Sequence, residues 1–187
     1  MKRDFDIIVY ATGFDAITGA YDLIDIRGIG GERLADKWKQ APSTYLGMLV
    51  HGFPNLLMPT GPQSASASTN FPRGIENGVN WCTKLLQHMW DRGLTRADPT
   101  LEAQERWTAH VAKMYEIMLM RKAKSWFTGY NSNVAGHEEG TVRYFVYNGG
   151  TPKFLGIIND VAARGYQEIA FGAGPTANAQ AAASASV

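Results

Sequence analysis

The sequence contains one cysteine among 187 residues, no long apolar run and almost no excess of charge of either sign. A single thiol leaves no cysteine pair to support zinc, so we expect Cys82 to be a buried packing residue in a reducing, cytoplasmic compartment. No apolar run approaches the roughly 20 residues needed to cross a bilayer. The formal net charge of +1 gives no electrostatic case for nucleic acid or an anionic membrane. We therefore expect small-molecule chemistry, with no nucleic-acid and no membrane partner.

The stretch DIIVYATGFD, residues 6–15, places a buried-looking strand at the very start of the chain. Residues 5–10 are apolar apart from Asp6 and rich in β-branched side chains, which is typical of a strand covered on both faces in a parallel sheet. Such a strand needs neighbours that crossover units supply, and none precedes it. We therefore expect an upstream part of the protein to be missing. The alternative is an N-terminal strand in a small α+β domain.

Two long helices are predicted in the middle of the chain. The first begins near Pro72 and ends at Gly93, and its candidate caps are Ser68, Thr69 and Asn70. Its apolar stripe consists of Ile75, Val79, Cys82, Leu85, Leu86 and Met89. The second helix is predicted to begin with Asp98 as its cap and Pro99 at its first position, and its stripe consists of Trp107, Val111, Met114 and Met118. We interpret both stripes as packing surfaces.

With the other predicted elements the chain has an α/β fold. Its apolar fraction of 45% is enough for one core. Residues 52–62 are predicted to contain a turn at Pro54 and Asn55 that leads into a second buried strand, a short apolar run that stops at Gly61 and Pro62. The last third predicts a β-α-β order: a strand over residues 141–150, a helix over 154–164 and a final strand over 166–171. Residues 172–187 are mostly Ala, Ser and Gly with little to bury, which predicts a disordered tail.

A ligand site is predicted where two strands end in glycine turns, at Thr12-Gly13 and Gly61-Pro62, because ligands of open α/β proteins collect at the carboxyl ends of strands. After Gly61 a loop of small residues leads into a helix N-terminus, which favours an anion or a developing negative charge. Small side chains would let a planar cofactor approach the backbone closely. An ordinary capped helix after a loop is the alternative.

Other kinds of site find no support in the sequence. No Gly-x-Ser-x-Gly elbow, P-loop or Gly-x-Gly-x-x-Gly after a strand is present. The histidines stand at no metal-ligand spacing, so we expect no metal and interpret them as solvated or packing residues: His51, His88, His110 and His137.

Six short motifs resemble, in order and approximate spacing, the C-terminal portion of Baeyer-Villiger monooxygenases, class B flavoproteins that use FAD and NADPH. They are YATGFD (10–15), STYLG (43–47), GFPNL (52–56), GP (61–62), WFTG (126–129) and VYNGG (146–150). The resemblance implies that this chain is an incomplete part of a protein with two dinucleotide-binding domains, FAD and NADPH. Those N-terminal domains would supply the neighbours of the first strand.

The resemblance also implies site residues and domain limits. It puts Ala11, Thr12 and Gly13 near the FAD, and Phe14 and Asp15 at the hinge between the dinucleotide domains. Residues 62–71 would line the flavin and the ketone, with cofactor contacts from Pro62, Asn70 and Phe71 and a substrate pocket formed by Ser66, Ala67, Ser68 and Phe71. Trp126 would fold over NADP. Residues 1–15 would be the strand and hinge, 16–171 the rest of the FAD and substrate domain, and 172–187 the tail.

The activity that the resemblance implies is insertion of one oxygen atom of O2 next to a ketone carbonyl, which gives an ester or lactone. Catalytic residues are expected upstream, so the isolated chain is expected to be inactive. Negative charge on the flavin ring would be stabilised by the N-terminus of the helix that begins near Phe71. Two alternatives stay open: a flavin monooxygenase that oxidises amines or sulfides, and a non-catalytic module that binds a partner.

Overall fold

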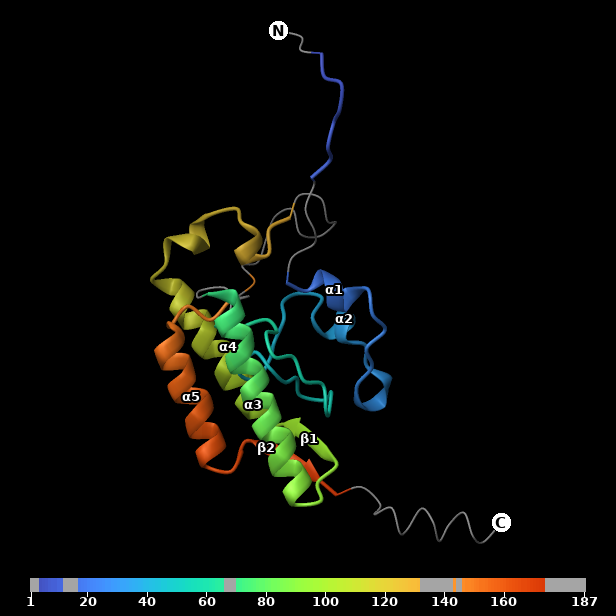
Figure 1. The fold of residues 1–187 in the computed structure, drawn as a ribbon, viewed down its shortest axis with the longest axis vertical. Helices are drawn as coiled ribbons and strands as arrows, with labels where there is room; N and C mark the ends of the chain where they lie inside the picture. Colours follow the sequence, from blue (N-terminus) through green and yellow to red (C-terminus); the bar gives the residue numbers. More distant parts are fainter. Residues whose placement is uncertain (1–3, 12–16, 66–69, 132–142, 144–145, 174–187) are drawn as a thin grey trace, which may run out of the picture.

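The computed structural model describes residues 4–11, 17–65, 70–131, 143 and 146–173. Figure 1 shows three long helices side by side: α3 (Phe71–Asp91), α4 (Leu101–Glu116) and α5 (Thr151–Ala163). At one end of this layer, β1 (Arg96–Pro99) and β2 (Ile169–Gly172) form a two-stranded antiparallel sheet. Both α3 and α5 begin at the end away from the sheet. The short elements are α1 (Gly19–Asp22), η1 (Ile29–Gly31), α2 (Leu34–Lys37), η3 (Leu119–Lys122) and η4 (Trp126–Thr128).

Helix α3 begins where the sequence predicts, with Asn70 as its cap. Asn70 Oδ1 accepts a hydrogen bond from the backbone N–H of Arg73 at 3.3 Å, and Pro72 lies in the first turn. Just beyond the helix, Gly93 has a φ of +63°, a conformation that favours glycine. The buried face consists of Gly78, Trp81, Cys82, Leu85 and Met89. Half of the predicted stripe is therefore wrong, because three members are between 44% and 52% exposed: Ile75, Val79 and Leu86.

Helix α4 is capped by Thr100, so the predicted cap at Asp98 is wrong. Thr100 Oγ1 accepts a hydrogen bond from the N–H of Ala103 at 3.2 Å. Asp98 and Pro99 belong to β1 instead. The carboxylate of Asp98 is buried and accepts the N–H of Gly52 at 2.9 Å, so a partner far away in the sequence has replaced a local cap.

The predicted first strand does not form. Residues 4–11 extend away from the rest of the described chain (Figure 1), and their large apolar side chains are between 67% and 84% exposed: Phe5, Ile7, Ile8, Val9 and Tyr10. A strand requires a neighbour for its backbone N–H and C=O groups. No described strand lies beside this segment, so it has no partner for interstrand hydrogen bonds among the described residues.

Two further strand predictions are wrong for the described residues. The predicted turn at Pro54 and Asn55 is confirmed, with a φ of +64° at Asn55, but the apolar run that follows it up to residue 62 is not a strand. Residues 143 and 146–150, the described part of the predicted strand over 141–150, are not in a strand either. The final strand is confirmed as β2, but it pairs with β1 and not within a β-α-β unit. The predicted tail lies outside the described residues from residue 174 onward.

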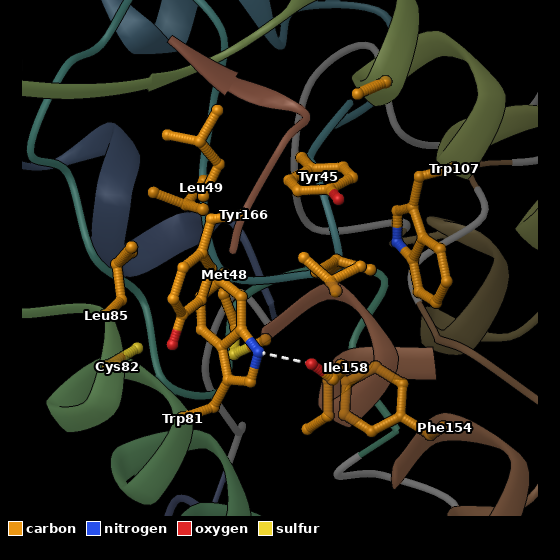
Figure 2. Packing of buried hydrophobic residues seen from close by; sticks show 14 of the residues in the cluster. Tyr45, Met48, Leu49, Trp81, Cys82, Leu85, Trp107, Phe154, Ile158 and Tyr166 are labelled. Atoms are coloured by element: carbon orange, nitrogen blue, oxygen red, sulfur yellow. Dashed lines mark hydrogen bonds between the residues drawn. The ribbon is translucent and has the colours of Figure 1, made fainter. Parts of the chain in front are cut away.

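The main core lies between the three helices and the turn over residues 45–49. Figure 2 shows Trp81 of α3 donating a hydrogen bond from Nε1 to the carbonyl of Ile158 in α5, at 2.8 Å. Trp107 of α4 stacks on Tyr147 with ring centroids 5.3 Å apart. Cys82 is buried as predicted, and burial raises the pKa of its thiol to about 11, so it stays protonated.

A second, smaller cluster packs beneath α1 and α2. It consists of Leu34, Trp38, Val50, Phe53 and Met58. Among the described helices, none has the length and apolar character that crossing a membrane requires.

Candidate functional site

The loop that leads into α3 borders a small hollow between two helix starts. Ser64 and Ala65 line it from the loop, Gly74 and Asn77 from α3, and Thr151 and Phe154 from α5, together with Pro59. Its interior of about 10 Å³ holds roughly one water molecule. The predicted small-residue loop and two helix N-termini therefore meet at one end of the helical layer.

The turn over residues 45–49 holds this loop in place. Gly47 has a φ of +71°, and a Cβ atom there would lie 2.4 Å from the backbone nitrogen of Ser64. On its other side, Ser64 accepts the N–H of Tyr147 at 3.0 Å through its carbonyl. The STYLG and VYNGG motifs therefore contact the same loop residue, Ser64, from two sides.

The GFPNL motif has a scaffolding role. Asn55 acts as an extra partner for β1: its side chain accepts the N–H of Ala97 at 2.9 Å and donates to the carbonyl of Thr95 at 2.9 Å. Its own N–H donates to the carbonyl of Ala97 at 2.9 Å. The motif therefore fixes the turns over residues 52–62 to the sheet and contributes no reactive group.

The first turn of α3 is open to a ligand. Asn70 is exposed and Phe71 is 53% exposed. Pro72 has no N–H, Arg73 donates to Asn70, and the N–H of Phe71 makes no hydrogen bond to another described residue. A helix of 21 residues adds a positive partial charge at this point. The start of α3 therefore fits the electron-rich edge of a planar group such as FAD.

Trp126 lies in η4, at the same end of the helical layer as the start of α3 (Figure 1). It is 45% exposed and stacks on Phe127 with ring centroids 3.8 Å apart. Gly129 follows with a φ of +79°, and its Cα packs on the side chain of Arg143, whose Nη2 donates to the carbonyl of Lys39 at 3.1 Å. The indole therefore presents an exposed face on an anchored turn.

The structure brings together only part of the predicted site. Pro62 is buried at the start of the loop, whereas Asn70 and Phe71 are exposed at its end. Ala11 is exposed in the extended segment 4–11. The other predicted residues lie outside the described residues: Thr12, Gly13, Phe14, Asp15, Ser66, Ala67 and Ser68.

The histidines lie apart, as expected. His51 Nδ1 is 2.9 Å from the carbonyl of Pro99, whereas His88 packs against Tyr166 and His110 against Trp107. His137 lies outside the described residues. Within the described ranges, no group of three or more potential ligands could hold a metal ion.

Two polar residues with distant partners were missed from sequence. Gln63 has a fully buried carboxamide next to Pro62, and the half-buried Glu168 receives hydrogen bonds from Tyr45 and Arg106. Glu168 carries no local signal, since its partners are distant in sequence. For Gln63, the signal was a long amide side chain within a loop otherwise made of small residues.

No family model matches the chain, but individual proteins do. It is 37% identical over 169 residues to acetone monooxygenase (methyl acetate-forming) from Gordonia sp. strain TY-5, covering 90% of this chain and 31% of that protein. A phenazine N-monooxygenase from Lysobacter antibioticus is 36% identical over 167 residues, 89% of this chain and 30% of that protein. A Baeyer-Villiger monooxygenase from Pseudooceanicola batsensis is 34% identical over 168 residues, 90% and 30% respectively. The chain thus spans about 30% of the length of these relatives.

Solved structures agree. Cyclohexanone monooxygenase from Rhodococcus sp. Phi1, bound to NADP⁺, matches with a TM-score of 0.82 at 31% identity, over 92% of this chain and 31% of that chain. OTEMO in complex with FAD and NADP matches with a TM-score of 0.78 at 35% identity, over 91% and 30%. Sequence and fold together therefore define a monooxygenase related to proteins solved with FAD and NADP. The chain belongs to the Baeyer-Villiger monooxygenases and corresponds to their C-terminal part.

Proposed function

We propose that this chain is the C-terminal part of an FAD- and NADPH-dependent monooxygenase that inserts one oxygen atom of O2 next to a ketone carbonyl, giving an ester or lactone. The observation that carries the proposal is 37% identity, over 90% of the chain, to an acetone monooxygenase that forms methyl acetate. The positive end of α3, where Phe71 is exposed and its N–H makes no hydrogen bond to another described residue, supports it from the structure.

The bound FAD would supply electron transfer from NADPH and oxygen activation. Residues of this chain would orient it: Ala11, Thr12 and Gly13 beside the flavin, and Pro62, Asn70 and Phe71 at the start of α3. The N-terminus of α3 would stabilise negative charge on the ring as a fixed dipole that needs no reorganisation. Phe14 and Asp15 would form the hinge between the dinucleotide domains.

The ketone would lie along the same loop, against Ser66, Ala67, Ser68 and Phe71. Trp126 would cover the NADP with the exposed face of its indole and help to exclude water from the reaction. The acid, base or charged group that acts directly on the reacting oxygen would come from outside this chain.

Exposed apolar side chains support a larger protein over an independent module. The segment 4–11 and the outer face of α3 together expose Phe5, Ile7, Ile8, Val9, Tyr10, Phe71, Ile75, Val79 and Leu86. The two stretches are separate, and exposed apolar patches of this kind mark contacts with another body. We expect the FAD and NADPH domains to cover it, with residues 1–15 as strand and hinge, 16–171 within the FAD and substrate domain, and 172–187 as a tail.

Product analysis with the complete enzyme tests the activity. The FAD-loaded enzyme, supplied with NADPH and isotopically heavy oxygen gas, should convert acetone, cyclopentanone or cyclohexanone to an ester or lactone that carries one heavy oxygen atom. Failure with every ketone, combined with turnover of amines or sulfides, would overturn the proposal. A parallel titration of the isolated chain with FAD should show no saturable quenching of flavin fluorescence.

Oxidation at nitrogen is the second candidate. The observation that favours it is 36% identity to a phenazine N-monooxygenase over 89% of the chain. The same assay separates the two, because N-oxide formation from phenazine with no ester from any ketone would support this candidate. For location, we expect the cytoplasm, because the chain has one cysteine and it is buried as a thiol.

A further inference from the structure

Gln63 is fully buried, and its carboxamide joins three segments of the chain. Oε1 accepts the N–H of Thr44 at 3.0 Å, and Nε2 donates to the carbonyl of Pro42 at 3.0 Å. Thr108 Oγ1 of α4 lies 3.3 Å from the same Oε1. The side chain therefore ties the start of the loop to residues 42–44 and to α4.

The backbone at Gln63 is held in an unfavourable conformation. Its φ is +68°, which costs a non-glycine residue roughly 1–2 kcal/mol. Such strain persists where the surroundings determine the conformation. Here the hydroxyl of Thr44 lies 3.0 Å from the carbonyl of Pro62, and the next residue, Ser64, packs directly on Gly47.

We infer that Gln63 is a positioning residue for the flavin and the ketone, because it fixes the backbone of residues 62–65 against the start of α3. Ser64 and Ala65 line the hollow that Gly74 and Asn77 of α3 complete, so a shift of residues 62–65 changes the surface beside the first turns of that helix. The inference rests on the proposed function, which locates FAD at the start of α3 and the ketone along the loop.

Two substitutions separate positioning from bulk stability. Gln63→Leu keeps the volume but leaves the carbonyl of Pro42 and the N–H of Thr44 without a partner. Gln63→Glu is nearly isosteric: a protonated carboxyl both donates to Pro42 and accepts from Thr44, whereas an ionised one cannot donate. Burial raises the pKa of a carboxyl group, so Gln63→Glu should preserve the network at low pH and lose it as the pH rises.

Gln104 provides the matched control. It is also a buried glutamine, 3% exposed in α4, and its Oε1 accepts the N–H of His51 at 2.7 Å. His51 lies before the turns over residues 52–62, away from the hollow. Gln104→Leu and Gln104→Glu therefore impose the same chemical change in the core without touching residues 62–65.

The test uses the complete enzyme loaded with FAD and records the visible flavin bands, the dissociation constant of FAD and the KM for ketone. For Gln63→Leu we expect shifted flavin bands and a KM raised about fivefold, with the rate of flavin reduction by NADPH within about twofold of wild type. The flavin bands and KM of Gln63→Glu should match those of wild type near about pH 6 and those of Gln63→Leu near about pH 9. Both Gln104 variants should lower Tm but leave the bands and the KM unchanged.

Unchanged bands and KM in Gln63→Leu, with a loss of Tm equal to that of Gln104→Leu, would overturn the inference. Changes in Gln63→Glu that do not reverse with pH would overturn it as well. If wild-type enzyme forms no ester or lactone, the proposed function fails. The comparison of flavin bands and FAD affinity between Gln63→Leu and wild type then still decides the role of Gln63.

Discussion

The hydroxyl of Tyr45 donates a hydrogen bond to the carboxylate of Glu168, 123 residues further along the chain, with the two oxygens 2.5 Å apart. Arg106 pairs with the other carboxylate oxygen. The carbonyl of Glu168 accepts the N–H of Thr100, the cap of α4, at 2.9 Å. Together these bonds join the turn over residues 45–49, helix α4 and the residue before β2.

Tyr45→Phe should lower the free energy of unfolding by about 1.5–3 kcal/mol, because it removes a hydrogen bond to a charged group while keeping the buried ring. Urea denaturation measures the change. A double-mutant cycle with Glu168→Gln should give a coupling of about 0.5–3 kcal/mol. Strictly additive effects would contradict a direct interaction.

The acid sensitivity of the fold should depend on Glu168. Partial burial acts to raise the pKa of this carboxyl, but the hydrogen bonds from Tyr45 and Arg106 outweigh it and hold the pKa below its ordinary value. A lowered pKa in the folded state contributes stability above the unfolded pKa of about 4.3, and this stability is lost as the pH falls through the folded pKa. Glu168→Gln should make the free energy of unfolding less dependent on pH between about pH 5 and pH 2. An unchanged slope would refute this.

Gly78 of α3 should not tolerate a methyl group. A Cβ atom there would lie 1.8 Å from the carbonyl oxygen of Pro59, a backbone atom of the loop that crosses the helix. We expect Gly78→Ala to destabilise the protein by about 1–3 kcal/mol or more, measured as a loss of Tm. In Gly156→Ala of α5, the control, a Cβ atom has nothing within 4 Å, so that variant should gain roughly 0.5–1 kcal/mol. Equal effects would contradict the close approach.

Asn70 allows helix capping to be separated from an effect on the flavin. Asn70→Ala should cost about 1 kcal/mol of stability through loss of the cap. Asn70→Asp keeps the cap, but in the complete enzyme it adds negative charge beside the proposed flavin and should lower the flavin reduction potential. Thr100→Asp makes the same change at the start of α4, next to the sheet, and should leave the potential unchanged. A potential that responds equally to both would argue against FAD at α3.

Trp126→Ala in the complete enzyme should weaken retention of NADP by about tenfold, equivalent to about 1.4 kcal/mol, and increase the release of hydrogen peroxide. Trp126→Phe keeps an aromatic face, so its NADP retention and peroxide release should lie between those of wild type and Trp126→Ala. Equilibrium binding of NADP and peroxide detection measure both effects. Unchanged peroxide release in Trp126→Ala would refute the covering role.

Local chemistry made α3 and α5 predictable, whereas distant partners defeated the other predictions. Asn70 and Pro72 act within one turn of each other, so the start of α3 was visible in sequence. Asp98 looked like a cap but bonds to Gly52, 46 residues away. The strand pattern of residues 5–10 is genuine in composition, yet no described strand lies beside it.

The sequence predicted where the candidate site lies, but it did not predict how individual residues hold it in place. The small-residue loop and the helix start could be located, because glycine, proline and cap residues act locally. The roles of Gln63 and Glu168 could not be predicted, since each depends on segments that only the tertiary fold brings together.

The pairing of Arg96 with Gly172 holds the last residue of β2 against the start of β1. The sheet lies at the opposite end of the helical layer from the start of α3 (Figure 1). A fluorescent label attached to an exposed residue of this sheet would therefore report on the stability of the fold from a position remote from the proposed cofactor.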